Sequence, residues 1–259
     1  MKILLTNDDG YESAGLELLH DKLSEVCKDL HIMAPSGERS TSGHSLNLDK
    51  PLRVKSYGEN KKHCSGFPAD CVLLSLGHFH KKNLPDLVVS GINKGANLSQ
   101  DIYYSATVAG AREAVFHGVN GIAVSLACKF LVEDQTFNFD TAAEIVKRFI
   151  SAGINDILEP RTLLNINVPN IKLSEIKGIK LTNLGFRRYS EEIEKRVDGR
   201  NRDYYWIVGK LEGHDDIENS DCQAILDGYV SVSLLPVIIG DIVNLSKLEA
   251  LIKELNRGF

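Results

Sequence analysis

KILLTNDDG, residues 2–10, is a short apolar run followed at once by polar residues and a glycine. This pattern is typical of a buried β-strand that ends in a turn. Residues 15–28 then place apolar side chains at three- and four-residue steps, which predicts an amphipathic helix. A second strand is expected over residues 30–34, where Pro35 ends it. A strand, a helix and a strand in this order predict a parallel pair joined by a right-handed crossover.

The alternation of strands and helices continues through the first half of the chain. Further helices are expected over residues 69–79, 107–117 and 141–150, and further strands over residues 87–90, 121–125 and 163–168. Short apolar strands separated by helices indicate a parallel sheet that is covered on both faces. The sequence therefore predicts an α/β fold, a Rossmann-like, doubly wound three-layer sandwich with a mostly parallel sheet.

The second half of the chain has a different character. Strands are expected over residues 178–182, 204–208 and 229–235, and a closing helix over residues 244–256. The charged stretch 187–203 has no apolar period, so it indicates an extension with little core of its own. Such arms are often exchanged between protomers. We predict a single domain over residues 1–259, with a ligand-binding core in residues 1–170 and an extension with C-terminal oligomerisation elements in residues 171–259.

Composition excludes several classes of protein. In 259 residues, 30 Lys and Arg stand against 35 Asp and Glu, so the net charge of −5 does not favour duplex nucleic acid. No apolar run approaches the roughly 18 residues of a membrane span, and the N-terminus reaches two acids too early for a secretory signal. The five cysteines are an odd number without a C-x-x-C pair, which indicates reduced thiols. We expect a cytoplasmic protein with no membrane partner.

Three polar loops are expected at one edge of the sheet, outside the carboxyl ends of the strands, where ligands bind in such folds. Asp8 and Asp9 follow the first strand, SGERSTSGHS (36–45) follows the second, and NKGAN (93–97) follows the strand at 87–90. Adjacent buried carboxylates repel each other, and a divalent cation removes that cost. Carboxylate, hydroxyl and amide oxygens suit Mg²⁺, Mn²⁺ or Ca²⁺ better than zinc. A plain turn is the alternative for the first loop taken alone.

Ser105 and Thr107 lie at the expected start of the helix over residues 107–117. The free N–H groups and the positive dipole end of that helix predict an anion site. Ser105 also fits a simple N-cap, and the two roles are compatible. In the second loop, hydroxyls and glycines can cradle a phosphate, although such clusters are usually plain loops. His44 is either a general acid for a leaving alkoxide or a loop histidine.

Several sequence blocks occur together in order along the chain. They are ILLTNDDG (3–10), APSGERS (34–40), GHS (43–45), SGFPAD (65–70), SGINKGAN (90–97), YSAT (104–107), LNINVP (164–169) and DGYVSV (227–232). In these blocks and their spacing, the sequence resembles the SurE family of survival-protein nucleotidases. The resemblance spans nearly the whole chain, so it is far more specific than a lone glycine-rich loop.

The resemblance implies a divalent-metal-dependent phosphomonoesterase that hydrolyses nucleoside 5′- and 3′-monophosphates, and in some members short polyphosphate. One divalent ion per subunit, Mg²⁺ or Mn²⁺, is implied at Asp8, Asp9, Ser40 and Asn93. Contacts to the substrate phosphate are implied at Asn97, Ser105 and Thr107. An exchanged C-terminal element implies a homodimer or a homotetramer.

Two positions depart from the family's pattern. Phe67 stands where the family usually has threonine, and Ala106 stands where it usually has glycine. The methyl group of Ala106 is expected to shift the backbone if that position requires a positive φ. Phe67 is expected to alter the wall of the pocket. Both departures bear on substrate preference more than on metal binding.

The expected chemistry is phosphoryl transfer to water, in which positioning and charge stabilisation dominate. A bound divalent ion lowers the pKa of its water, and Asp8 or Asp9 orients or deprotonates that water. The sequence does not distinguish these two roles, and it leaves a covalent aspartyl-phosphate open. Ser105, Thr107 and the helix N-terminus are expected to hold the phosphate in line.

Three other interpretations fit parts of the sequence. A nicotinamide-dependent oxidoreductase fits the alternation of elements, but the first loop lacks G-x-G-x-x-G. A haloacid-dehalogenase-type phosphatase requires two acids two residues apart, whereas Asp8 and Asp9 are adjacent. A non-catalytic protein that binds nucleotide through the same metal site stays open, and only a turnover assay separates it from an enzyme.

Overall fold

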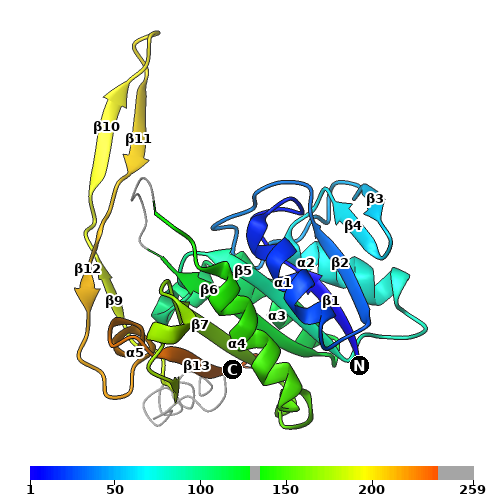
Figure 1. Cartoon of the computed structure of the whole chain (residues 1–259). Coiled ribbons are helices and arrows are strands. Elements are labelled where there is room, and N and C mark those ends of the chain that lie inside the picture. The colour runs from blue at the N-terminus through cyan, green and yellow to red at the C-terminus, as the bar shows by residue number, and fades with distance from the viewer. Residues whose placement is uncertain (129–134, 239–259) are drawn as a thin grey trace, which may run out of the picture.

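A nine-stranded, mostly parallel sheet forms the centre of the computed structural model, which describes residues 1–128 and 135–238 (Figure 1). The parallel strands are β1 (Lys2–Thr6), β2 (Asp29–Pro35), β4 (Lys61–Cys64), β5 (Leu87–Lys94), β6 (Asn120–Ala127) and β7 (Thr162–Pro169). The edges add β3 (Val54–Gly58), antiparallel to β4, and β13 (Val230–Pro236), antiparallel to β7, followed by β8 (Ile179–Leu181). The order is β3-β4-β2-β1-β5-β6-β7-β13-β8.

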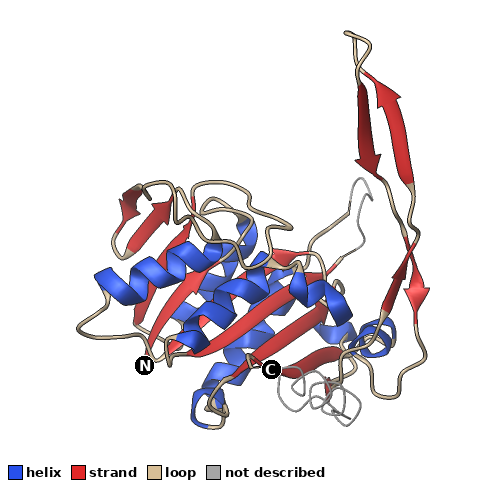
Figure 2. Ribbon diagram, turned by 180° about the vertical axis from the view of Figure 1, so that it is seen from behind, coloured by secondary structure: helices blue, strands red, loops and turns tan. Residues whose placement is uncertain are grey.

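Helices cover both faces of this sheet (Figures 1 and 2). They are α1 (Ala14–Ser24), α2 (Pro68–Leu74), α3 (Ala106–Phe116), α4 (Phe139–Ser151) and α5 (Asp221–Leu226), with a π-helical turn η1 (Ser75–Phe79) and 3-10 turns η2 (Ser99–Tyr103), η3 (Ile154–Asp156) and η4 (Leu173–Glu175). Ile3 and Leu5 pack in one buried cluster with α1 and α4. Leu4, between them, packs in another with α2 and α3. Since side chains alternate along a strand, the two helix pairs lie on opposite faces.

The predicted α/β fold is confirmed, and the strands and helices expected in residues 1–170 lie within a few residues of their expected bounds. The predictions from sequence missed the β3–β4 hairpin, the short helix α5 and the strands Arg187–Tyr189, Ile193–Val197 and Leu211–His214, whereas the strand Asp203–Ile207 was expected over residues 204–208. The strand expected over residues 87–90 continues to Lys94, so Asn93 lies in a strand and not in a loop. The helix expected over residues 244–256 falls outside the described residues.

A long hairpin projects from the body and forms an arm, here residues 187–214 (Figures 1 and 2). Its root pairs β9 (Arg187–Tyr189) with β12 (Leu211–His214), and its distal part pairs β10 (Ile193–Val197) with β11 (Asp203–Ile207). Every residue of β10 and β11 is exposed. The expected core-poor extension is therefore present, and its role in oligomerisation stays a prediction.

Two further expectations can be compared with the structure. All five cysteines are free, and four of them are buried, as expected for reduced core thiols. Within residues 1–128 and 135–238, no helix has the length and apolar character needed to cross a bilayer.

Candidate functional site

The carboxyl end of β1 is a topological switch point. β1 pairs with β2 on one side and with β5 on the other, so the connections leave it in opposite directions. Such a point opens a crevice where ligands bind in doubly wound sheets. Asp8 and Asp9 follow β1 directly. The first loop therefore lies where the fold favours a ligand.

The first and second loops pack against each other at this edge. The backbone N–H of Arg39 donates to the carbonyl oxygen of Asp8 over 2.7 Å. A Cβ atom added to Gly10, whose φ is +99°, would lie 3.2 Å from the Cα of Gly37. Glycine at position 10 is therefore required both by the backbone conformation and by the close approach of the second loop.

Asp8 is buried beneath this edge, with 4% of its surface exposed. The hydroxyl of Thr107 donates to its Oδ1 over 2.5 Å. Burial raises the pKa of Asp8 to about 6, against the hydrogen bond from Thr107, and the charge of Asp9 raises it further. The Asp8 carboxylate is thus fixed in orientation, and its negative charge is poorly compensated.

Asp9 is less buried than Asp8 and lies beside β5. Its Oδ2 accepts a hydrogen bond from the backbone N–H of Lys94 over 3.3 Å. Burial raises the pKa of Asp9 as well, against this hydrogen bond, and the charge of Glu38 adds to the effect. Negative charge therefore accumulates at the switch point, and a cation bound there would stabilise both carboxylates.

Ser40 and Asn93 add neutral oxygens from the two neighbouring segments. The Nδ2 of Asn93 donates to the carbonyl of Gly95 over 2.8 Å, which leaves its Oδ1 free to act as a ligand. Ser40 is exposed, and its hydroxyl donates to Glu38 over 2.9 Å. Ser40 follows Arg39, which is bonded to Asp8, so the second loop carries it to the same edge.

The chemistry of these donors fits a hard divalent cation. Within the described parts of the chain, no group of three or more His, Cys, Asp or Glu residues could hold a metal. Hydroxyl and amide oxygens of Ser40 and Asn93 are the side-chain donors that could complete a metal site beside the two carboxylates. Mg²⁺ and Mn²⁺ accept such an all-oxygen set, which zinc and softer metals do not favour.

The N-terminus of α3 points at the same edge. Ser105 is its N-cap, because its Oγ accepts from the backbone N–H of Val108 over 3.0 Å. The N–H groups of Ala106 and Thr107 have no acceptor within the helix, as in any first turn. Since the Thr107 hydroxyl is engaged by Asp8, these backbone groups are the donors available to a phosphate.

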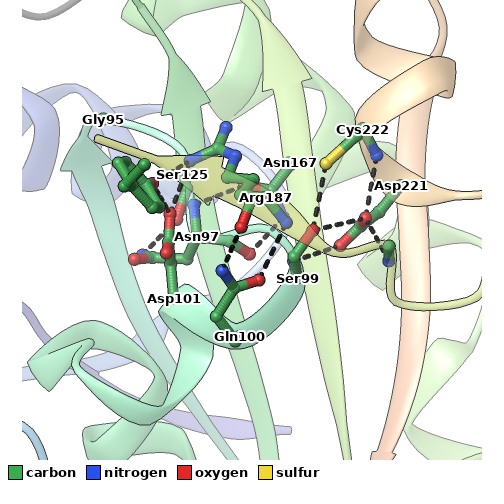
Figure 3. A network of polar contacts seen from close by, with 12 residues as sticks. Gly95, Asn97, Ser99, Gln100, Asp101, Ser125, Asn167, Arg187, Asp221 and Cys222 are labelled. Carbon is green, nitrogen blue, oxygen red and sulfur yellow. Dashed lines mark hydrogen bonds and ion pairs between the residues drawn. The ribbon is translucent and has the colours of Figure 1, made fainter. Parts of the chain in front are cut away.

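Asn97 lies in a buried network of amides (Figure 3). Its Nδ2 donates to Ser125 over 2.7 Å, and its backbone N–H donates to the Oδ1 of Asn167 over 2.8 Å. Its carbonyl accepts from the side-chain amides of Asn165 and Asn167. The structure shows Asn97 anchoring the segment between β5 and α3. Its contact with a phosphate stays a prediction.

His44 contacts the C-terminal half of α3. Its Nε2 is 2.7 Å from Glu113, and His117 lies 3.0 Å from the other oxygen of the same carboxylate. Its ring stacks on Phe116, with 5.5 Å between the centroids. Burial favours a higher pKa for Glu113, but the hydrogen bonds from His44 and His117 lower it overall. These contacts favour the loop histidine over the general acid.

The two departures from the family pattern have different outcomes. Ala106 starts α3 and does not have a positive φ. The condition for a backbone shift at Ala106 is therefore not met, and a first-turn helical residue accommodates a Cβ without strain. Phe67 lies under the guanidinium of Arg39, 5.6 Å from the ring centroid, and so contributes to the wall beside the second loop.

Sequence reasoning missed Asp70, which holds the second loop. The Oδ2 of Asp70 accepts from the N–H of Phe67 and from Nδ2 of Asn47, each over 2.9 Å, and its Oδ1 accepts from the backbone N–H of Asn47. Phe67 is the N-cap and has no capping oxygen, so SGFPAD carries only half of a capping box: the acid at N3 that accepts from the N-cap N–H, after a proline at N1. Asn165 and Asn167 were also missed. They are two residues apart in an apolar strand, so their side chains lie on the same face of the sheet, which indicates a polar contact there.

Comparison with known proteins identifies the relatives of this chain. Residues 3–191 match the family model described as survival protein SurE. The 5′-nucleotidase SurE of Aliarcobacter butzleri is 40% identical over 258 residues, which cover 95% of this chain and 97% of that protein. The 5′-nucleotidase SurE of Vibrio cholerae is 39% identical, with all of both chains covered. The crystal structure of the SurE protein from Aquifex aeolicus superposes with a TM-score of 0.83 at 35% identity, over 99% of this chain and 100% of that chain.

Proposed function

The chain belongs to the SurE family, and from this we propose that it is a 5′-nucleotidase that hydrolyses nucleoside monophosphates to nucleoside and phosphate. The observation that carries the proposal is the meeting of two acids with a helix N-terminus. Asp8 and Asp9 crowd negative charge at the switch point, while the first turn of α3 offers free N–H groups at the same edge. A phosphate ester with a bridging cation complements both features.

We propose that hydrolysis depends on one divalent ion, Mg²⁺ or Mn²⁺, held by Asp8, Asp9, Ser40 and Asn93. A divalent ion in such a site neutralises phosphoryl oxygens and lowers the pKa of bound water. Two features of the chain support this assignment: burial raises the pKa of both carboxylates, so that a bound cation would stabilise their charged forms, and the Asn93 amide donates to Gly95, so that its oxygen is free.

The chain's own residues would divide the remaining work. Thr107 holds one oxygen of Asp8, so Asp8 has a fixed orientation from which it can direct a water molecule. Asp9 is held through one oxygen by Lys94. The N–H groups of Ala106 and Thr107 would bind phosphate oxygens and keep the leaving ester oxygen in line. The pH dependence of kcat, measured separately for Asp8→Asn and for Asp9→Asn, would show which of the two acids takes the proton from water.

The finer parts of the function rest on the family resemblance. We propose nucleoside 3′-monophosphates and short polyphosphate as further substrates, and a homodimer or homotetramer built with the C-terminal elements. A cytoplasmic location is proposed on separate grounds, the scattered cysteines and the N-terminal sequence. A protein that binds nucleotide through the same metal site without hydrolysing it is the competing function. The relatives named 5′-nucleotidase SurE favour the enzyme, and a turnover assay separates the two functions.

A metal-by-substrate screen tests the proposal. Purified protein, stripped of metal with a chelator, is assayed for release of phosphate from AMP, GMP and 3′-AMP, alone and with Mg²⁺, Mn²⁺ or Ca²⁺. We expect turnover of 5′-monophosphates only when a divalent ion is restored. Nucleotide binding in calorimetry without phosphate release under any metal would establish the non-catalytic alternative instead.

A further inference from the structure

The root of the arm is bound to the segment that leads into α3 (Figure 3). The side-chain amide of Gln100 donates to the carbonyl of Arg187 over 2.6 Å and accepts from its N–H over 2.9 Å. One side chain from η2 therefore satisfies both backbone polar groups of Arg187, the first residue of β9. This arrangement fixes β9 against η2 in one register.

An ion pair strengthens the same junction. Nη1 of Arg187 lies 2.6 Å from the Oδ2 of Asp101, and the hydroxyl of Tyr189 donates to that same oxygen over 2.6 Å. The side chains of Arg187 and Asp101 are only 12% and 19% exposed. Because the pair is largely removed from water, loss of one partner leaves the other poorly compensated.

Asp221 makes a second attachment on the other side of Gln100 (Figure 3). This carboxylate is fully buried. It accepts from the backbone N–H groups of Ser99 over 2.7 Å, Gly185 over 2.8 Å and Cys222 over 2.8 Å. It thus joins three pieces of chain: η2, the approach to the arm, and the start of α5. Ser99 has a φ of 55°, a conformation that non-glycine residues adopt at a cost and that these contacts hold.

The attached segment also determines where α3 begins. The carbonyl of Asp101 accepts from the N–H groups of Tyr104 over 3.0 Å and Ser105 over 3.1 Å. Asp101 therefore binds the arm with its side chain and the N-cap of α3 with its backbone. The carbonyl of Tyr104 in turn accepts from Gly43 of the second loop over 3.0 Å. A shift of Asp101 would be transmitted to the first turn of α3 and to the second loop.

We infer that Arg187 and Asp101 are positioning residues for the phosphate site: docking of the arm's root through this pair holds residues 99–105 so that the first turn of α3 meets the substrate phosphate. This inference rests on the proposed function and deepens it. Neither residue needs to touch the substrate. The arm then contributes to substrate affinity through the geometry of its root.

Paired steady-state and binding measurements test the inference. Hydrolysis of AMP and calorimetric binding of inorganic phosphate are measured on the Mn²⁺-loaded protein. We expect Arg187→Gln and Asp101→Asn each to raise the KM for AMP and the Kd for phosphate by about tenfold, with a smaller fall in kcat, because misplaced donors weaken binding and Thr107 in the same turn orients Asp8. The double variant is expected to be no worse than either single one, since both remove the same contact. Arg187→Lys should recover part of the affinity.

Arg188 supplies the matched control. It is the next residue of β9 and forms an ion pair with Asp215 over 2.6 Å, but both of these side chains are about half exposed, and the pair joins β9 to the residue that follows β12 without touching η2. Arg188→Gln is expected to leave KM and phosphate affinity at the wild-type values. An equal loss in this control would overturn the inference, because the effect would then belong to the arm's charge in general.

The remaining outcomes separate the inference from the proposed function. Folded Arg187→Gln and Asp101→Asn proteins with wild-type KM and phosphate affinity would overturn the inference alone. If those variants do not fold, Tyr189→Phe removes the hydrogen bond to Asp101 and a longer one from Arg187 while it leaves the ion pair in place, and a rise in KM of about twofold is expected. No rise in that variant also overturns the inference. If the wild-type protein neither binds phosphate nor hydrolyses AMP, the proposed function is overturned. The inference then fails as well, because there is no phosphate site for Arg187 and Asp101 to position.

Discussion

The carboxylate of Asp8, which contacts the first turn of α3, and that of Glu113, in the second half of α3, are about equally buried but have different neighbours. Asp8 is 4% exposed and Glu113 is 5% exposed. Glu113 receives hydrogen bonds from His44 and His117, which lower its pKa in spite of burial. Asp8 accepts one hydrogen bond, from the hydroxyl of Thr107, and its neighbour Asp9 is also negatively charged. Burial and the charge of Asp9 together raise the pKa of Asp8 to about 6. Two histidines therefore stabilise the charge of Glu113, whereas the charge of Asp8 at the switch point would be stabilised by a bound ligand.

The largest expected effect comes from removing the charge at the switch point. Asp8→Asn keeps the shape of the side chain and its contact with Thr107, but it removes a metal ligand and the oriented acid. We expect phosphate release from AMP to fall by at least about a thousandfold. Asp29→Asn, at the opposite end of the sheet, is the control and should keep full activity. Near-normal turnover of Asp8→Asn with Mn²⁺ would contradict the assignment of this site.

Metal binding should stabilise the folded protein through the same acids. At a Mn²⁺ concentration of about 100 times the Kd, the gain is about 2.7 kcal/mol, which corresponds to a rise in Tm of several degrees. Thermal unfolding of the chelator-treated wild type, with and without Mn²⁺, measures it. The Asp8→Asn protein should show little or no rise, and an equal rise in both proteins would place the metal elsewhere.

Glu113→Gln tests how much the hydrogen bonds from His44 and His117 to the Glu113 carboxylate stabilise the fold. We expect a loss of about 2 kcal/mol of unfolding free energy at pH 7, because a buried carboxylate with two hydrogen bonds from histidines is replaced by an amide. The pKa of Glu113 is lowered in the folded protein, so its stabilisation is present above its ordinary value of 4.5 and is lost as the pH falls below that value.

Urea unfolding at pH 7 and at pH 3.5 measures this difference. The gap in stability between wild type and Glu113→Gln should narrow at the lower pH, because below about 4.5 the unfolded chain takes up a proton at this carboxylate more readily than the folded protein does. A constant gap would show that packing, rather than charge, accounts for the loss. Turnover at pH 7 should change little, because Glu113 makes no contact with the two aspartates.

The smallest expected effect concerns Ala106. Restoring the glycine that the family usually has at this position should cost about 0.5–1 kcal/mol, since glycine is a poorer helix former than alanine. The KM for AMP should remain at its wild-type value, because Ala106 already has a helical backbone. A marked fall in KM in Ala106→Gly would mean that the methyl group narrows the phosphate site.

The sequence predicted the centre of this fold well because its strands are short apolar runs buried on both faces. It also placed Asp8 and Asp9 correctly at the edge of the sheet, since a strand followed by polar residues indicates where the strand ends. The hairpin of β3 and β4 was missed because its strands are polar, as the Lys-Lys-His-Cys of β4 shows, and are held by backbone pairing at the sheet edge.

The contacts of individual side chains could not be predicted in the same way. His44 and Glu113 are 69 residues apart, so only the tertiary structure shows that they form a pair. The same holds for Gln100 and Arg187, which are 87 residues apart. Charged residues such as Arg187 fit a solvated surface equally well in a sequence, and their burial depends on which loop the sheet brings beside them.

The position of β13 has a consequence for synthesis of the protein. β8 precedes the arm and β13 follows it, yet β13 lies between β7 and β8 in the sheet. A nascent chain that has emerged only as far as the arm therefore leaves the edge of β7 open and β8 without its neighbour. We expect such ribosome-bound fragments to need protection from aggregation until the segment after the arm is translated and closes the sheet.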